Sequence, residues 1–402
     1  MAHAYIVSPL RTPVGKFGGS LTPLSAADLA AHILRAVLQR SGASAESVDE
    51  VIVAQSYQSS EAPCIGRYAA SLAGLPEHVS GYAVDRRCGS GLQAVIDAAM
   101  QIQTGAAHCV LVAGVESMSN IEYYSTRMRW GARLGDAAFH DRLDRGRVNS
   151  QPVSRYGVMA GGAAETAENL ARDYGITRAE SDLYAARSHQ RASEAWKTGR
   201  FEAEVVPVPV PQRKGETVLF ARDEGIREDA SLEAMAKLPA LLRDGTVTAG
   251  NACQQNDAAS GCLVVSEAWL AKHAAQPMGR FVGWAAAGCD PLRMGIGPVP
   301  AVARLLPRIG LSLADMDLIE INEAFAVQVI AALREWHIES EACEERVNVN
   351  GSGISLGHPI GATGVRIMTT MLHEMARRGA RYGLETMCIG GGQGLAAVFE
   401  RV

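Results

Sequence analysis

The residues of this chain best suited to nucleophilic chemistry surround Cys88. The cysteine follows a short apolar segment, 81–85, and precedes an apolar run at helical spacing that Gly105 ends. This pattern predicts a strand that passes into a buried helix, with the cysteine at the junction. A helix N-terminus favours a thiolate over a thiol, and Arg86 and Arg87 add positive charge if they point inward. Free cysteines are usually core residues, so this motif alone only marks a candidate nucleophile.

A histidine occupies a second glycine-rich stretch, which follows a short expected strand at 347–349. Its spacing first suggests a dinucleotide-binding loop, but Pro359 argues against one because that fold starts a helix within the glycine run. Gly357 and Pro359 instead hold His358 in non-helical backbone. A histidine fixed in this way is a candidate catalytic base, and a structural histidine is the alternative.

Two further segments carry groups that could take part in acyl chemistry. Cys388 ends an expected strand at 384–389, which passes into glycines and returns at 395–400. Open N–H groups such as that of Gly390 could stabilise an oxyanion, whereas the alternatives are a core cysteine and a loose hairpin. Asn322 follows an expected strand and is predicted to cap the next helix, although its amide could also hold a ligand or water.

The elements that must position these residues alternate between strands and helices, which predicts an α/β fold with helices packed on a parallel or mixed sheet. The rhythm breaks between 116 and 250, as expected for an inserted segment. Afterwards the first pattern returns: 37–42 resembles 305–310, and 48–53 resembles 316–321 at the same offset of 268 residues. Such repetition predicts two similar halves whose pseudo-twofold axis brings the Cys88 turn and the His358 turn together.

Composition limits the function classes. The 402 residues carry a net charge of -5 without a basic patch, so nucleic acid is not the expected partner. The eight cysteines form no C-x-x-C pair and suggest intracellular thiols. The sequence shows no signal peptide and no apolar run of ~20 residues, so we expect a soluble cytoplasmic protein without a membrane span.

Four motifs together resemble those of the thiolases, the acetyl-CoA C-acyltransferases. They are the Cys88 stretch, Asn322-Glu323-Ala324-Phe325-Ala326, Gly357-His358-Pro359-Ile360-Gly361-Ala362-Thr363-Gly364 and Cys388-Ile389-Gly390-Gly391-Gly392. The resemblance covers essentially the whole chain. It implies two duplicated α/β halves that form a five-layered α-β-α-β-α core with an inserted loop domain. The halves would comprise 1–119 with 250–272, and 273–402, and the loop domain 120–249.

The resemblance also implies the catalytic roles. Cys88 carries the acyl group as a thioester, and His358 takes the proton of its thiol. Cys388 acts as the second acid and base at the α-carbon of acetyl-CoA. Asn322 holds a water that lines one oxyanion hole with His358, and the N–H groups of Cys88 and Gly390 form the other. The implied reaction is thiolytic cleavage of a 3-ketoacyl-CoA, or the reverse condensation, with CoA as cosubstrate and neither a metal nor another cofactor.

Substrate and subunit contacts follow from the same resemblance. Arg227 matches a position that contacts the CoA nucleotide, and Met294 and Phe325 match positions that wall the acyl and pantetheine end. The segment 129–136 resembles the family's tetramerisation loop, so a homotetramer built as a dimer of dimers is expected.

Two departures from the family pattern concern the substrate channel. After Ala252 the chain has Cys253 and Gln254, where the family usually has serine and glycine. Gln254 would either crowd the pantetheine channel or add a hydrogen bond. Ala163 stands where acetoacetyl-CoA-specific members have a histidine and methionine pair nearby, which predicts a roomier pocket and tolerance of acyl chains longer than acetyl.

Two other functions fit the same kind of scaffold. A ketoacyl-synthase-type condensing enzyme usually pairs its cysteine with two histidines, or with a histidine and an asparagine, and Cys388 disfavours it. A non-catalytic acyl-CoA-binding protein is disfavoured by the intact set of catalytic residues.

Overall fold

The computed structural model describes residues 2–148, 162–212, 215–338 and 340–402. Its centre is a ten-stranded mixed sheet in the order β12-β13-β14-β11-β1-β10-β5-β3-β4, with β2 paired to β10. The strands are β1 (Ala4–Arg11), β2 (Gly15–Lys16), β3 (Glu50–Ala54), β4 (Ser80–Val84), β5 (Cys109–Ser117), β10 (Asn256–Ser266), β11 (Pro277–Gly288), β12 (Leu318–Ile321), β13 (Tyr382–Ile389) and β14 (Gln393–Arg401). Two hairpins lie outside it, formed by β6 (Tyr123–Tyr124) with β7 (His140–Asp141) and by β8 (Val208–Pro211) with β9 (Thr217–Phe220).

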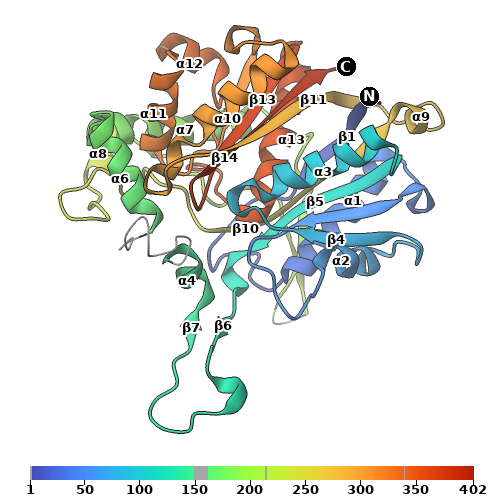
Figure 1. The fold of residues 1–402 in the computed structure, drawn as a ribbon, viewed down its shortest axis with the longest axis horizontal. Coiled ribbons are helices and arrows are strands. Elements are labelled where there is room, and N and C mark those ends of the chain that lie inside the picture. The colour runs from blue at the N-terminus through green and yellow to red at the C-terminus, as the bar shows by residue number, and fades with distance from the viewer. Residues whose placement is uncertain (1, 149–161, 213–214, 339) are drawn as a thin grey trace.

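Helices cover both faces of the sheet in layers (Figure 1). The main ones are α1 (Ala26–Ser41), α2 (Ile65–Ala73), α3 (Ser90–Thr104), α10 (Pro298–Leu305), α11 (Ala326–Glu335) and α13 (Ile360–Arg378). Apolar residues of α3 and α13 share one buried cluster with inward-facing residues of both halves of the sheet. Separate clusters seal α1 and α2 against the N-terminal strands, and α10 and α11 against the C-terminal strands. This arrangement is the expected five-layered α-β-α-β-α core.

Further helices surround this core. They are α4 (Arg142–Val148), α6 (Ala163–Asp173), α7 (Arg178–Lys197), α8 (Leu232–Ala236), α9 (Glu267–Leu270) and α12 (Ser340–Arg346). Ser25 and Thr177 begin α1 and α7 with capping boxes, as their spacing from Asp28 and Glu180 indicates. Among the described residues, no helix combines the length and apolar character needed to cross a bilayer.

The two halves of the sheet repeat one topology. Strands β3 and β5 run parallel and β5 pairs antiparallel with β10, while β12 and β13 run parallel and β13 pairs antiparallel with β14. The first residues of β3 and β12 are separated by the same 268 residues as the sequence repeat. The cap glycines Gly42 and Gly310 both adopt left-handed backbone, with φ of 67° and 69°. The predicted duplication is therefore visible in the strand pairing.

The central helices cross at a pair of glycines, one from each half. A Cβ atom on Gly364 would lie 2.0 Å from the backbone nitrogen of Leu92, and one on Gly91 would lie 2.9 Å from the backbone nitrogen of Gly364. Only glycine permits this approach of two backbones. The crossing brings the N-terminus of α3, which follows Cys88, beside that of α13, which follows His358.

Two local predictions are wrong. Asn322 is not a helix cap, because α11 begins four residues later and its N-cap is Phe325. The expected strand at 347–349 is reduced to one parallel bridge between Val347 and Ile319. The proposed domain boundaries stay a prediction.

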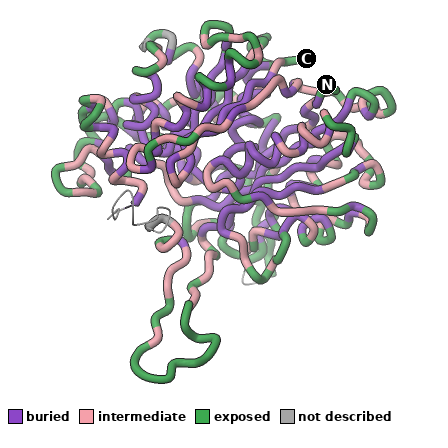
Figure 2. The backbone as a smooth tube through the Cα atoms, viewed as in Figure 1, coloured by how far each residue is buried: buried purple, intermediate pink, exposed green. Residues whose placement is uncertain are grey.

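One segment leaves the compact body. The chain between β6 and β7 forms an extended arm, and most of its residues are exposed (Figure 2). Its tip presents several large apolar side chains to solvent, including Trp130, 89 % exposed, and Leu134, 98 % exposed.

Candidate active site

Cys88 lies in a single turn of 3-10 helix, Arg87–Gly89, between β4 and α3. The preceding residue, Arg87, has a φ of +51°, a left-handed conformation that side-chain-bearing residues rarely adopt. A Cβ atom on Gly89 would lie 2.5 Å from Cδ1 of Ile389, so this glycine lets the end of β13 approach the turn. The strained turn therefore aims the sulfur of Cys88 towards the segment that carries Cys388.

The sulfur of Cys88 faces backbone N–H groups, including that of Gly390 and its own. Burial nevertheless raises the pKa of the Cys88 thiol, and these N–H groups together with the charge of Arg87 offset the rise only in part. The N–H groups and Arg87 thus favour the thiolate as expected, but burial outweighs them and the net shift favours the thiol. A thiol that stays protonated needs a base to become a nucleophile.

His358 is the base that lies in the same site. Its Nδ1 is 2.6 Å from Oγ1 of Thr363, and the Thr363 hydroxyl donates to the carbonyl oxygen of Pro359 over 3.0 Å. Since that hydroxyl proton is already engaged, Nδ1–H donates to Thr363, and Nε2 is left with its lone pair. Burial lowers the pKa of His358 to about 3, and the charge of Arg366 adds to the effect. The imidazole is therefore neutral and able to accept a proton at Nε2.

Asn322 completes this side of the site. Its Nδ2 lies 3.5 Å from Nε2 of His358. Its Oδ1 is buried and has no hydrogen-bond partner among the described residues. A buried amide oxygen without a partner is costly unless it binds a water or a substrate group. The geometry therefore fits the water-holding role that the family resemblance implies.

Cys388 is the second thiol of the site. It is the penultimate residue of β13, is 1 % exposed and packs in an apolar cluster with Met294 and Phe325. Burial raises its pKa well above the ordinary value, and the neighbouring sulfur of Cys88 raises it further. Such a thiol holds its proton firmly and can donate it to a strong carbon base.

A cavity of about 630 Å³ unites these groups. This size is typical of a site for a small organic ligand. Its wall contains eight of the expected site residues: Cys88, Ala163, Cys253, Met294, Phe325, His358, Cys388 and Gly390. Asn322 contacts His358 but does not line the cavity, and Arg227 is exposed and also lies outside the wall.

The side chain of Gln254 lines the cavity and donates to the carbonyl oxygens of Gly225 and Ile354. Of its two expected effects, the added hydrogen bond is observed.

Two buried glutamates position the catalytic loops. Glu116 accepts hydrogen bonds from the backbone N–H groups of Ser56, Tyr57 and Gly361, and so joins the end of β5 to the first turn of α13. Burial raises its pKa to about 7 despite these donors. Glu323 accepts from Tyr184, Ser188, Asn348 and the N–H of Ile354. It therefore fixes the loop before His358 against the segment of Asn322.

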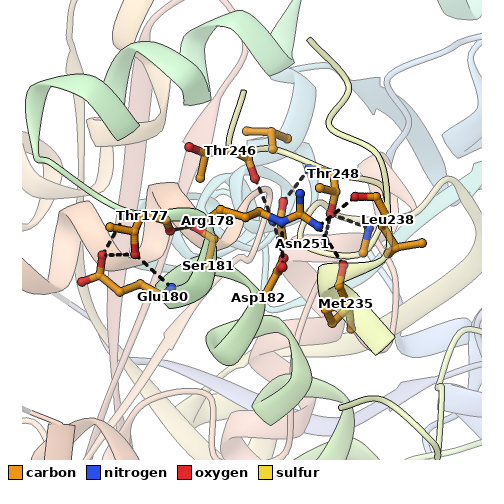
Figure 3. Close-up of polar contacts among 12 residues, drawn as sticks. Thr177, Arg178, Glu180, Ser181, Asp182, Met235, Leu238, Thr246, Thr248 and Asn251 are labelled. Carbon is orange, nitrogen blue, oxygen red and sulfur yellow. Dashed lines mark hydrogen bonds and ion pairs between the residues drawn. The ribbon is translucent and has the colours of Figure 1, made fainter. Parts of the chain in front are cut away.

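A polar network on α7 supports the opposite wall (Figure 3). Arg178 donates to Asp182 and to the carbonyl oxygens of Met235 and Leu238. Asp182 in turn accepts from Nδ2 of Asn251 over 2.9 Å, and Oδ1 of Asn251 accepts from the N–H of Thr248. The network thus holds the segment that supplies Ala249, Ala252 and Cys253 to the cavity.

Sequence reasoning missed several residues that this site uses. Thr363 orients the imidazole, and its place on the first turn of the helix after His358 was a usable signal. Glu116 gave no signal, because the groups that it contacts are distant in the chain. Tyr57 and Met118 line the cavity from segments that carry no motif.

The fold and the site together place two thiols and a neutral imidazole in one cavity, an arrangement suited to acyl transfer. Comparison with known proteins agrees. Residues 4–268 match the family model "Thiolase, N-terminal domain", and residues 275–401 match "Thiolase, C-terminal domain". This chain belongs to the thiolase family.

Individual relatives are similar over their full length. An acetyl-CoA acetyltransferase of Chromobacterium violaceum is 44 % identical over 98 % of this chain and 99 % of its own. The crystal structure of the Bacillus anthracis acetyl-CoA acetyltransferase has a TM-score of 0.94 at 41 % identity, covering 100 % of this chain and 99 % of that one. Human mitochondrial 3-ketoacyl-CoA thiolase in complex with CoA has a TM-score of 0.92 at 39 % identity, covering 100 % and 98 %. These similarities favour a thiolase over both a ketoacyl synthase and a non-catalytic binding protein.

Proposed function

We propose that this protein is an acetyl-CoA C-acyltransferase that cleaves 3-ketoacyl-CoA with CoA, or condenses acyl-CoA with acetyl-CoA, through an acyl group on Cys88. The observation that carries the proposal is that Cys88, His358 and Cys388 line one cavity while the N–H of Gly390 faces the Cys88 sulfur. CoA acts as cosubstrate, and the thiol and imidazole groups need no resident metal or other cofactor.

Cleavage begins when Nε2 of His358 takes the thiol proton of Cys88. The sulfur attacks the 3-keto carbon, and the N–H groups of Cys88 and Gly390 stabilise the resulting oxyanion. The bond between C2 and C3 then breaks, the acyl group stays on Cys88, and the enolate of acetyl-CoA leaves. Cys388 donates its proton to the enolate carbon, since that carbon is far more basic than a thiolate. His358 and the water held by Asn322 stabilise the enolate oxygen.

The second half-reaction restores the enzyme. The Cys388 thiolate takes the thiol proton of the incoming CoA, whose sulfur attacks the acyl-Cys88 thioester. The N–H groups of Cys88 and Gly390 stabilise this oxyanion too. Acyl-CoA leaves, and His358 returns its proton to the Cys88 sulfur. Two sequential transfers through one covalent intermediate give ping-pong kinetics.

The decisive experiment follows the absorbance of acetoacetyl-CoA in the presence of CoA. We expect wild-type protein to consume it and Cys88→Ala to lose activity by at least about 10⁴-fold, as for other nucleophile deletions. Cys64→Ala is the matched control because Cys64 is exposed and lies outside the cavity wall. Full activity of Cys88→Ala, in protein that still unfolds cooperatively, contradicts the assignment.

We further propose that the acyl pocket accepts chains longer than acetyl and that the protein serves fatty acid metabolism. Ala163 leaves space at the cavity wall beside Met294 and Phe325, which supports this view. Met294, Phe325 and Cys253 would contact the acyl and pantetheine parts, and Arg227 the CoA nucleotide. A series of 3-ketoacyl-CoA thioesters tests the idea, and activity confined to acetoacetyl-CoA contradicts it.

The same proposal includes a cytoplasmic homotetramer, assembled as a dimer of dimers. The free state of all eight cysteines supports a reducing compartment. The exposed apolar side chains at the tip of the β6–β7 arm support assembly through this arm. Replacing 128–134 by a glycine-serine loop is expected to halve the mass measured by analytical ultracentrifugation. An unchanged mass contradicts assembly through the arm.

A further inference from the structure

Arg87 is a charged residue in the cavity wall that the proposed mechanism does not use. It precedes Cys88 directly and is only partly buried. Its Nη2 donates to the carbonyl oxygen of Gly146 over 3.1 Å, and its guanidinium carbon lies 5.8 Å from the centre of the Tyr57 ring. Neither contact neutralises the guanidinium, and among the described residues its side-chain N–H groups donate only to Gly146.

Among the described residues, no carboxylate forms an ion pair with the guanidinium of Arg87. The residues that line the cavity include neither aspartate nor glutamate, and no ion pair involving Arg87 occurs in the described part of the chain. The nearest acid in sequence, Asp85, accepts a hydrogen bond from the backbone N–H of Arg87. The stretch 149–161, which the structure does not describe, contains no acidic residue. A cation in a largely apolar cavity is costly unless a ligand pairs with it.

Arg87 lies on a different wall from the side assigned to CoA. Gln254 donates a hydrogen bond to the carbonyl oxygen of Gly225, two residues before Arg227. On the same side, the N–H of Phe17 donates to the carbonyl oxygen of Gln255, and the N–H of Lys16 donates to Glu224. Arg87 instead contacts α4 through Gly146 and stacks on Tyr57, which packs with Met118 and Leu143. The cation therefore faces the acyl part of a substrate whose reacting carbon is held at Cys88.

We propose that Arg87 is a specificity-determining residue that binds a carboxylate at the far end of the acyl chain. The natural substrate is then a 3-ketoacyl-CoA derived from a dicarboxylic acid, and the acyl group left on Cys88 carries the terminal carboxylate. A guanidinium suits this task because its planar donors match the two oxygens of a carboxylate. This inference rests on the thiolase function proposed above and narrows its substrate class.

The test compares pairs of six-carbon and eight-carbon 3-ketoacyl-CoA thioesters, one ending in a carboxylate and the other in a methyl group. For wild-type protein we expect kcat/KM to favour the carboxylate-ended member of at least one pair. In Arg87→Leu this ratio is expected to fall about 10- to 100-fold, as for the loss of a hydrogen bond to a charged group. Any effect of Arg87 on the reactivity of Cys88 acts on both substrates and cancels in the ratio.

Two variants make the result specific. Arg86→Leu removes the neighbouring arginine, which is absent from the cavity wall, and should leave the ratio unchanged. Arg87→Lys should keep part of the preference, since it retains the charge and loses the planar fork. A wild-type preference for the methyl-ended substrates, an unchanged ratio in Arg87→Leu, or a ratio that responds to Lys16→Met instead overturns the inference. Failure to cleave any member of the series counts against the thiolase function itself.

Discussion

The hydrogen bond between His358 and Thr363 decides which imidazole nitrogen can act as a base. Thr363 accepts a hydrogen bond from Nδ1–H, and its hydroxyl donates one to the carbonyl oxygen of Pro359. The lone pair of Nε2 therefore points into the site with Asn322 beside it. We therefore expect the chemistry of Cys88 to depend on Thr363, although this threonine does not line the cavity.

Replacing Thr363 distinguishes a role in orienting the His358 imidazole from a role in binding the substrate. Thr363→Val removes the acceptor of Nδ1–H, so we expect kcat to fall about 10- to 100-fold while KM changes little, a loss typical of an orienting partner. Thr363→Ser keeps the acceptor and should restore most of the rate. Steady-state thiolysis of acetoacetyl-CoA measures both constants. Equal rates for Thr363→Val and wild type contradict the assigned tautomer.

The low pKa of His358 has a consequence for pH dependence. Burial holds this pKa near 3, below the ordinary 6.5, so the folded protein keeps the imidazole neutral throughout pH 5–8. The plot of log kcat/KM for the 3-ketoacyl-CoA should thus show no acid limb with a midpoint near 6.5. The unfolded chain protonates this histidine below pH 6.5, so its contribution to stability is lost as pH falls from 6.5 towards 3. A decline of log kcat/KM with a midpoint near pH 6.5, unchanged in Thr363→Val, contradicts this expectation.

Individual site residues could be predicted from the sequence where they lie within a recognisable motif. Cys88, His358 and Cys388 were each marked by neighbouring glycines or a proline, and all three line the cavity. The protonation state of Cys88 could not be predicted, because its pKa depends on burial by segments distant in the chain.

Among the elements, the crossing of α3 and α13 controls how closely the two catalytic turns approach. The backbones of these helices meet at Gly91 and Gly364, and neither position has room for a methyl group. Spacing of apolar residues predicted both helices, and the repeat predicted that they are equivalent. The contact between the two helices could not be predicted, because it depends on how they pack against each other in the folded protein.

A single methyl group at the crossing tests its importance. Gly364→Ala would place its Cβ 2.0 Å from backbone that cannot move as a side chain does, so we expect a loss of about 3 kcal/mol or more of unfolding free energy. Gly42→Ala is the matched control, since its Cβ meets open space and only the left-handed φ of 67° is unfavourable, at a cost of about 1 kcal/mol. Urea denaturation measures both. Similar losses in the two variants contradict the close contact.

Asn322 shows why element boundaries were harder to predict. An asparagine after a strand and before an apolar run is a typical N-cap, and the sequence offered no reason to expect otherwise. In the structure, the residues 322–325 form an extended connection that is fastened by Glu323 and by the bond between Cys253 N–H and Ala324. Tertiary contacts outweigh local preference here and free the amide for the site.

Across the whole molecule, two carboxyl groups buried between the sheet and α13 limit stability at neutral pH. Glu320 and Glu385 are direct neighbours on β12 and β13, and both oxygens of Glu385 lack hydrogen-bond partners among the described residues. Burial raises the pKa of both groups well above the ordinary value. The folded state therefore binds these protons more tightly than the unfolded state, and stability falls as pH rises above about 4.5.

Removing one of these carboxyl groups should stabilise the protein. Glu385→Met has a similar volume and leaves Glu320 as the acidic neighbour of Arg366, so we expect a gain of about 1–3 kcal/mol at pH 8. The gain should shrink towards pH 4.5, where wild type is protonated. Thermal unfolding across this pH range measures it, with Glu77→Gln, an exposed position, as control. A destabilised Glu385→Met at pH 8 contradicts this account.

The position of β1 in the middle of the sheet affects how the chain is made. This first strand pairs with β10 on one side and with β11 on the other, so both of its neighbours come from residues 256–288. A ribosome must therefore release roughly two thirds of the polypeptide before the opening strand has either partner. Until then both edges of this strand lack hydrogen-bond partners, so we expect the nascent chain to be prone to aggregation during synthesis.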